Sequence, residues 1–485
     1  MAERLSAIHV AGVATAVGVG LLVYSQTLAF AWDEGFHLLA AQLVKAGRTL
    51  YLDFCFPQTP LNAYWNAGWM WVLGESWRAM HAVAALCALA AVCLAAGFAW
   101  SRFPVSDWRL AAAVMAVALI GMNPLVVQFG TIGQPYALCL VLLVASFRAA
   151  VCAVERERAL EAGLAGLAAG AAAASSLLAV TAGPVLLVWI VAYNRAGRRW
   201  RKAAAVAAGG TAAFVPLAWL LARDPRAVFF NVVQYHLLYR QVAWEDAMRH
   251  DVGTLSDWLD SAPALLLALL ALAGLWFVRD RSGWERARRA EFYLCAWLAA
   301  AAVAYFSLAV HPVFPAYFVL AVPFLGILAT AGLHSLAPQK PWRLLMALIF
   351  LVALGLGRQI SGDDYTWRML ETIAHKVDAV TPRGAPILAD PQVYFLTRRR
   401  PPSGMEHSDS HKLDFPAARA VVLHLASEAE VVRRIEAGAF AAVESCSDYK
   451  SFEDSAARRY AHSEEIEDCH LYWGRNSAPG IGLQQ

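Results

Sequence analysis

The chain has 485 residues, of which 59% are hydrophobic and only 16% charged, with a mean hydropathy of +0.48. Soluble domains carry about 45–50% apolar and about 25% charged residues, so the composition excludes an ordinary soluble protein. The formal net charge is only +3, and the arginine clusters lie between hydrophobic runs, where membrane topology explains them better than a nucleic-acid surface. We therefore predict a polytopic membrane protein with no nucleic-acid partner.

Apolar runs of roughly 18–22 residues are long enough to cross a ~30 Å hydrocarbon core as helices. A cleaved signal peptide ending near Ala29-Phe30-Ala31 is an alternative for the first run, but its roughly 20 residues exceed the usual signal-peptide core of about 7–15. We predict about eleven spans, at residues 8–30, 78–100, 108–126, 134–153, 160–177, 179–194, 203–222, 262–279, 291–310, 314–335 and 342–358.

The distribution of Lys and Arg predicts the orientation of these spans. With a cytoplasmic N-terminus, the basic loops at 101–109, 154–158, 195–202, 279–289 and 338–343 all face the cytoplasm. Residues 31–77, 223–261 and everything after about 358 then lie outside. The high Ala and Arg content suggests a GC-rich bacterial genome. We expect a bacterial inner (plasma) membrane protein whose C-terminal domain is periplasmic or otherwise extracytoplasmic.

The outer loops contain helical patterns rather than plain linkers. Residues 34–46 carry apolar side chains at helical spacing before Gly47, and a helix of this length should lie along the membrane surface. Residues 60–74 and the aromatic-rich stretch at 229–244 predict two further helices. The expected membrane domain is residues 1–358, with these two outer loops at 31–77 and 223–261.

Residues 359–485 have a different composition and predict a small soluble α/β domain. Cys446 and Cys469 would lie in an oxidising compartment, which permits a disulfide between them. Strand-length apolar runs occur at 385–390, 418–425, 439–445 and 469–474, with helical patterns at 365–380 and 426–437.

The first outer loop gathers polar side chains directly after the first span. It opens with Asp33 and Glu34, and His37 follows Asp33 at the spacing of one helical turn. A third carboxylate, Asp53, and the aromatic Tyr64 come later in the loop. The simplest alternative is a pair of solvated acids, with Asp33 capping the surface helix. The pattern also fits a pocket in which a carboxylate deprotonates a hydroxyl and aromatic faces bind a sugar.

The order of these residues resembles the membrane glycosyltransferases of the GT-C fold. The resemblance covers residues 31–76: D-E after span one, the surface helix, G-x-x-x-Y-x-D at 47–53 and P-L-x-x-Y-W at 60–65. The nearest branch is the protein O-mannosyltransferases and the lipid A aminoarabinose transferase. Gln134-Pro135-Tyr136 is similar to the family's R-P-E/D element, and His311-Pro312 through Pro323 to its H-x-x-Y…P span.

The resemblance implies an integral membrane glycosyltransferase with a polyprenyl-phosphate-linked sugar donor and a glycolipid, glycan or protein acceptor on the non-cytoplasmic face. Asp33 would be the catalytic base, with Glu34 beside it supporting the loop. Asp53, with His37 and Tyr64, would position the acceptor or order the loop. The lipid phosphate is already a leaving group, so the donor needs mainly positive charge around that phosphate.

This chain departs from the family at the residue expected to supply that charge. Aminoarabinose transferases carry a Lys in K-P-P-L, whereas this chain has Gln58-Thr59-Pro60-Leu61. We therefore consider other cations as phosphate ligands. Lipid-headgroup contact is the alternative for Arg240, and capping or packing is the alternative for His311. The candidates are Arg240 with His236, then His311, then Lys45 or Arg48.

Metal and cofactor motifs are weak. His407-Ser408-Asp409-Ser410-His411 offers metal-ligating types, but a solvated polar loop explains it better, and Asp363-Asp364 matches no metal motif of the family. We expect no cofactor and no divalent metal. Two other functions remain as alternatives. A transporter or flippase of lipid-linked sugars would need ionisable groups in mid-span. A non-catalytic envelope-binding subunit would not need three carboxylates in one loop.

Overall fold

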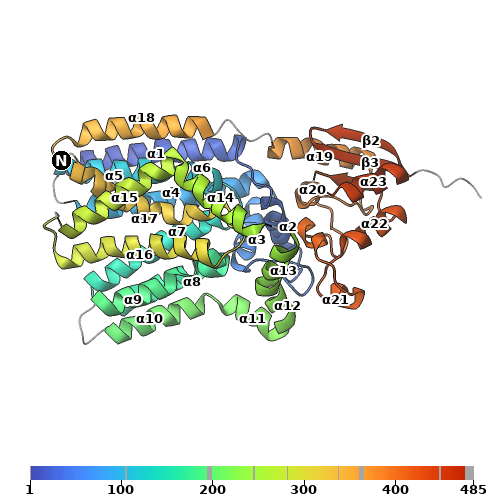
Figure 1. The fold of residues 1–485 in the computed structure, drawn as a ribbon, viewed down its shortest axis with the longest axis horizontal. Coiled ribbons are helices and arrows are strands. Elements are labelled where there is room, and N and C mark those ends of the chain that lie inside the picture. The colour runs from blue at the N-terminus through green and yellow to red at the C-terminus, as the bar shows by residue number, and fades with distance from the viewer. Residues whose placement is uncertain are drawn as a thin grey trace, which may run out of the picture.

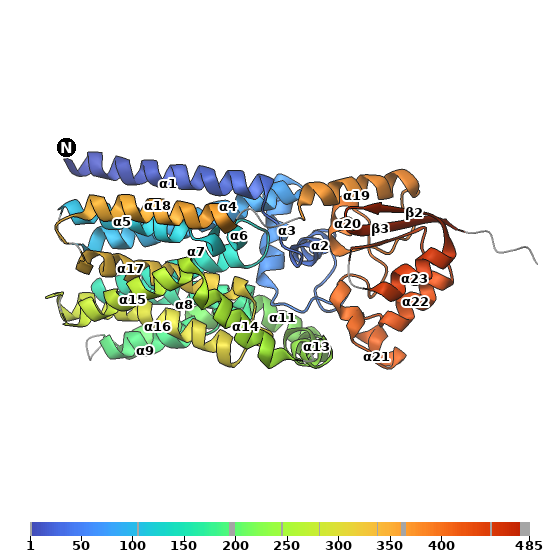
Figure 2. The same ribbon diagram turned by 45° about the horizontal axis from the view of Figure 1, so that its top comes forward.

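The apolar runs form helices that lie side by side in one bundle, with a smaller domain at one end of it (Figure 1). The structure is a computed structural model. It describes residues 2–103, 106–193, 199–243, 246–280, 282–336, 338–359, 365–446 and 449–475. The N-terminal end of α1 lies at the end of the bundle opposite to that domain (Figures 1 and 2).

Six helices in the described part of the chain are long and apolar enough to cross a membrane, which makes this a multi-pass membrane protein. They are α1 (Ala2–Thr27, apolar from Ala7), α4 (Trp77–Arg102), α7 (Tyr136–Glu155), α15 (Ala262–Asp280), α16 (Arg286–Leu308) and η3 (Pro315–Ala321) continued by α17 (Val322–Leu336). The expected count of about eleven is not confirmed.

The other five predicted spans form shorter or broken helices. Residues 203–222 divide into α10 (Arg199–Ala212) and α11 (Val215–Arg223), bent by 51°. Pro216 is the second residue of α11 and lacks the N–H that would continue the helix from α10. The 12 residues of α9 rise only about 18 Å, less than the ~30 Å core. The remaining helices are α5 (Ser106–Gly121), α8 (Ala159–Ser175), η1 (Leu177–Ala179) with α9 (Ala182–Tyr193), and α18 (Pro341–Gln359), of which only the shorter apolar stretch Pro341–Ala353 was assessed as a span.

Glycines allow two of the long helices to pack backbone against backbone. A Cβ on Gly274 of α15 would lie 2.0 Å from the carbonyl oxygen of Leu328 in α17. Reciprocally, a Cβ on Gly332 of α17 would lie 2.0 Å from the carbonyl oxygen of Leu270. Apolar side chains gain little from contact with each other rather than with lipid, so such close backbone contact is a main source of packing energy between membrane helices.

Helices of the outer loops lie at the end of the bundle that faces the smaller domain, and several of them lie between the two (Figures 1 and 2). The three predicted loop helices are present. The helix expected along the membrane surface, α2, is not an exposed helix, because protein buries nearly all of it and it packs against α3 and α20. The loop helices are α2 (Glu34–Lys45), α3 (Leu61–Leu73), α6 (Pro124–Phe129), α12 (Pro225–Phe229), η2 (Phe230–Gln234), α13 (Tyr235–Ala243) and α14 (Ala247–Asp260).

The C-terminal domain combines helices with a three-stranded antiparallel sheet of order β1-β3-β2. A disulfide between Cys446 and Cys469 joins the end of β1 to the start of β3. The elements are α19 (Trp367–Val380), α20 (Pro391–Thr397), η4 (Ser408–Lys412), α21 (Ala417–Val422), α22 (Glu428–Glu436), β1 (Ala442–Ser445), α23 (Lys450–Arg459), β2 (Tyr460–Ile466) and β3 (Cys469–Arg475).

Two of the four predicted strands are present, as β1 and β3. Residues 385–390 contribute a single bridge, Leu388 to Val443. Residues 418–425 are not a strand, because most of them form α21 or its end, with Val421 and Val422 exposed to solvent. The strand β2 was not predicted: most of its side chains are polar and at least partly exposed, so it lacks an apolar alternation.

Candidate active site

Asp33 lies where the first span meets α2. It does not cap α2, since its side chain makes no cap hydrogen bond. The side chain is accessible to solvent, yet protein surrounds it, and this burial raises its pKa from the ordinary 3.8 to about 6. The charge of Asp409 also raises the pKa, while that of Lys412 lowers it. A carboxylate that titrates near neutral pH is suited to general base catalysis.

Three tyrosines from different elements lie within electrostatic reach of Asp33. Tyr136 begins α7, Tyr239 lies on α13 and Tyr317 lies on η3. A phenol hydroxyl both donates and accepts hydrogen bonds, and its ring offers an apolar face. Asp33 is thus surrounded by groups that can bind the hydroxyls and ring faces of a sugar.

The C-terminal domain also reaches this site, through η4. Asp409 Oδ1 accepts a hydrogen bond from the Tyr239 hydroxyl at 3.0 Å and one from Lys412 Nζ at 2.9 Å. Burial acts to raise the pKa of Asp409, but His407, Lys412 and these hydrogen bonds outweigh it and hold the pKa below its usual value. Asp409 is therefore an anion at neutral pH, paired with Lys412 beside Asp33.

Glu34, predicted to support the loop beside the catalytic Asp33, is fully buried at the centre of a hydrogen-bond network. Its carboxylate accepts hydrogen bonds from His81 Nε2 at 2.8 Å, the Gly133 N–H at 2.5 Å and Trp367 Nε1 at 2.9 Å. His81 Nδ1 faces the carbonyl oxygen of Ser25 at 2.6 Å. His81 lies on α4, Gly133 in the loop before α7, and Trp367 on α19. Glu34 therefore joins three elements and holds Asp33 in place rather than meeting a substrate.

The three predicted loop-positioning residues take different places. His37 is buried and stacks on Phe36 with ring centroids 4.3 Å apart, and burial lowers its pKa to about 3, so the ring is neutral. Asp53 accepts a hydrogen bond from the Thr49 N–H at 2.6 Å, which orders its own loop. Tyr64 is partly buried on α3, and burial raises its pKa.

Two predicted phosphate ligands, Lys45 and His311, are already paired. Lys45 Nζ lies 2.7 Å from Glu75. It ends the 12-residue helix α2, which places it about 18 Å along the axis from Asp33. His311 Nδ1 donates to Asp251, whose other oxygen accepts from the Val313 N–H at 2.6 Å.

Arg240 and His236 lie one turn apart on α13. The backbone of Pro57 hydrogen-bonds His236. Arg240 follows Tyr239 on the same helix. Arg240 is therefore a cation next to the cluster with Asp409, although it is not among the charges that act on Asp33.

The suggested metal motif at 407–411 does not converge on one point. His407 Nε2 lies 3.0 Å from the Tyr235 hydroxyl, whereas His411 Nδ1 donates to the carbonyl oxygen of Ala426 at 2.7 Å. Elsewhere in the described ranges, Glu444 groups with two cysteines, but these form the disulfide and a metal needs thiolates. Asp363 and Asp364 lie outside the described residues.

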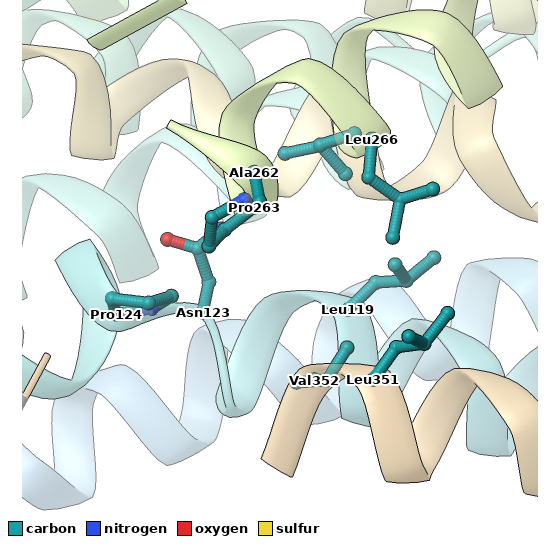
Figure 3. A pocket seen from close by; sticks show the side chains of 9 residues that line it. Leu119, Asn123, Pro124, Ala262, Pro263, Leu266, Leu351 and Val352 are labelled. Atoms are coloured by element: carbon teal, nitrogen blue, oxygen red, sulfur yellow. The ribbon is translucent and has the colours of Figure 1, made fainter. Parts of the chain in front are cut away.

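An apolar cavity of about 260 Å³ lies between α5, α6, α15 and α18, separate from these charges (Figure 3). Its walls contain a single polar side chain and no titratable group. A hydrocarbon chain suits this lining better than a sugar does. The lining residues are Leu119, Asn123, Pro124, Ala262, Pro263, Leu266, Leu267, Leu351 and Val352.

Comparison with solved structures identifies the fold. The ArnT structure from Cupriavidus metallidurans bound to undecaprenyl phosphate superposes with a TM-score of 0.68 at 15% identity, covering 96% of this chain and 97% of ArnT. The protein has the GT-C fold. The apo state of the same ArnT, a lipid A aminoarabinose transferase, gives a TM-score of 0.64 at 15% identity, covering 96% of this chain and 98% of ArnT.

A more distant GT-C structure is also similar. The apo oligosaccharyltransferase of Archaeoglobus fulgidus gives a TM-score of 0.51 at 12% identity, covering 80% of this chain and 64% of that one. No family model matches the chain, and no curated protein matches it in sequence. The resemblance to GT-C glycosyltransferases drawn from the first outer loop is confirmed at the level of fold.

Sequence reasoning missed the contribution of the C-terminal domain to the site. Asp409 and Lys412 lie more than 370 residues after Asp33 in the chain. Asp409 belongs to the stretch 407–411, which was interpreted as a solvated loop, and Lys412 follows it directly. Tyr239 and Tyr317 lie in stretches that were singled out, 229–244 and 311–323, but neither was named as a site residue. Tyr136 was included, within the element at 134–136. The one available signal for η4 was its density of polar residues.

Proposed function

We propose that the protein is an integral membrane glycosyltransferase that moves a sugar from a polyprenyl-phosphate donor to an acceptor of the cell envelope. The observation that carries the proposal is Asp33, accessible to solvent and titrating at about pH 6 within a GT-C fold. The fold neighbour ArnT, which has been seen with undecaprenyl phosphate, supports a lipid-phosphate donor.

In this proposal Asp33 takes the proton from a hydroxyl or amine of the acceptor. The acceptor atom forms a bond to the anomeric carbon of the donor sugar while the bond from that carbon to the phosphate oxygen breaks. Polyprenyl phosphate leaves with the electron pair. The tyrosines around Asp33 hold the sugar hydroxyls, and Glu34 keeps the Asp33 backbone in position through its three hydrogen-bond donors.

The transporter alternative finds less support. Ionisable residues of transporters gather near the membrane midplane. Here a partly buried ion-pair network of the bundle joins Arg102 to the exposed Glu155 and the buried Glu291. Arg102 and Glu155 are the last residues of α4 and α7, and Glu291 lies near the start of α16. The network is therefore at helix ends, where it closes one end of the bundle.

Native mass spectrometry of the protein purified in mild detergent tests the donor class. We expect a co-purified polyprenyl phosphate, or its sugar-loaded form, and the attached mass would give the class of sugar. Wild type and Asp33→Asn are compared, because a variant without the base should retain intact donor. Only bulk phospholipids in both preparations would argue for a non-catalytic membrane subunit.

A further inference from the structure

We propose that Lys412, from the C-terminal domain, is the cation that binds the phosphate of the lipid donor. This inference rests on the proposed function and adds the ligand that the first outer loop lacks. Gln58 occupies the place where the resembling transferases carry Lys, and a phosphate beside Asp33 requires a compensating positive charge.

The position of Lys412 fits this role better than that of the other cations. Lys412 is the one positive side chain whose charge acts on Asp33 among the residues described. Its side chain is about one third exposed (36%), so a ligand can reach it. Lys45 is bound to Glu75 at the far end of α2.

The hydrogen bonds of Lys412 leave room for an anion. An ammonium group has three donors, and here one goes to Asp409 at 2.9 Å while a second points to the Tyr239 hydroxyl at 3.5 Å. The Tyr239 ring also lies under the ammonium, 5.5 Å from its centroid. Asp409 and Tyr239 thus fix the lysine in one place, and the third donor remains for a phosphate oxygen.

The turn that carries Lys412 is firmly anchored, so the lysine is positioned before a ligand arrives. Ser408 Oγ donates to Asp390 at 2.9 Å, and the Tyr449 hydroxyl donates to the Ser408 carbonyl oxygen at 2.9 Å. On the opposite side, Tyr235 of α13 contacts His407. These contacts hold η4 between its own domain and the outer loop, which lowers the entropic cost of binding.

The test is binding of undecaprenyl phosphate to the full-length protein in nanodiscs. Lys412→Gln should weaken binding roughly tenfold to a hundredfold, as expected for loss of a charged hydrogen bond, while Lys412→Arg stays within about threefold. The matched control is Lys376→Gln, since Lys376 pairs with Glu464 at 2.6 Å and lies 5.4 Å from the Trp473 ring centroid, away from the site. This control should bind like wild type.

Because Lys412→Gln leaves Asp409 without its partner, the double variant Asp409→Asn with Lys412→Gln is measured as well, and it should also bind weakly. Wild-type affinity of the double variant for undecaprenyl phosphate would overturn the inference. So would a loss of affinity for phosphatidylglycerol in Lys412→Gln that equals its loss for undecaprenyl phosphate. Failure of wild type to bind undecaprenyl phosphate would instead refute the proposed function itself.

Discussion

Trp367 Nε1 donates a hydrogen bond to Glu34 Oε2 at 2.9 Å, joining residues 333 positions apart in the chain. Glu34 begins the first outer loop helix and Trp367 begins the C-terminal domain. This contact is buried and lies one residue from Asp33. The C-terminal domain is therefore held against the site, which allows residues of η4 to take part in it.

Glu34→Gln should destabilise the protein without changing any group that meets a substrate. Leaving a buried hydrogen-bond donor without its acceptor costs about 1–3 kcal/mol, and here an amide would replace the carboxylate that faces the donors of His81, Gly133 and Trp367. Thermal unfolding in detergent measures the change. The control is Glu371→Gln, which also pairs with a Trp and a cation but is one-third exposed, so its loss should be about 1 kcal/mol or less. Equal melting temperatures for the two variants would count against this role of Glu34.

The pH dependence of transfer should report the pKa of Asp33. The base must be deprotonated, so activity should rise with pH through about 6. Asp409→Asn removes a negative charge that raises this pKa and should move the midpoint to lower pH. Lys412→Gln removes a positive charge that lowers it and should move the midpoint upward. Initial rates between pH 4.5 and 8.5 measure both shifts; shifts in the same direction would contradict the assignment.

Reduction of the Cys446–Cys469 disulfide should loosen the part of the domain that carries η4. The two cysteines are 23 residues apart, and closing a loop of about this length contributes about 3 kcal/mol. The Cys446 N–H donates to Asp390, which also accepts from Ser408 of η4. We expect Cys446→Ser to increase proteolysis of residues 400–450 and to weaken donor binding. Unchanged proteolysis would show that the disulfide does not hold η4.

Gly332→Ala should destabilise the bundle. The added Cβ would lie 2.0 Å from the Leu270 carbonyl oxygen, and such overpacking typically costs about 1–3 kcal/mol. Gly97→Ala is the matched control, because nothing lies within 4 Å of a Cβ at that helical position. Thermal unfolding should show a lower midpoint for Gly332→Ala alone. Because Ala favours a helix more than Gly does, an unchanged or higher midpoint for Gly332→Ala would contradict the close packing.

Local patterns predicted local structure well. Apolar periodicity predicted α2, and long apolar runs predicted the membrane helices, because both patterns depend only on residues close together in the chain. The strand predicted at 418–425 is wrong, because a strand needs a partner to pair with. Pro416 instead precedes the helix α21, which contains most of this stretch. The bend between α10 and α11 was missed, although Pro216 was a usable signal.

The candidate site was predicted in part. Asp33 was named as a site residue because sequence order and the GT-C resemblance identify residues of the first loop, whereas Tyr136 was noted only within the element at 134–136. Lys412 and Asp409 could not be found this way, since nothing local connects η4 with Asp33. The supporting role of Glu34 was expected from the resemblance, but its partners His81 and Trp367 could not be identified, because tertiary packing brings them to Glu34.

The central claim is that Asp33 is the base of a sugar transfer from a lipid phosphate. The most direct measurement is release of polyprenyl phosphate from a polyprenyl-phosphate sugar by the purified protein with envelope acceptor, comparing wild type with Asp33→Asn. We predict release by wild type and at least a hundredfold less by the variant, as for loss of a general base, with equal melting temperatures and retained donor. Equal release by both proteins would contradict the account.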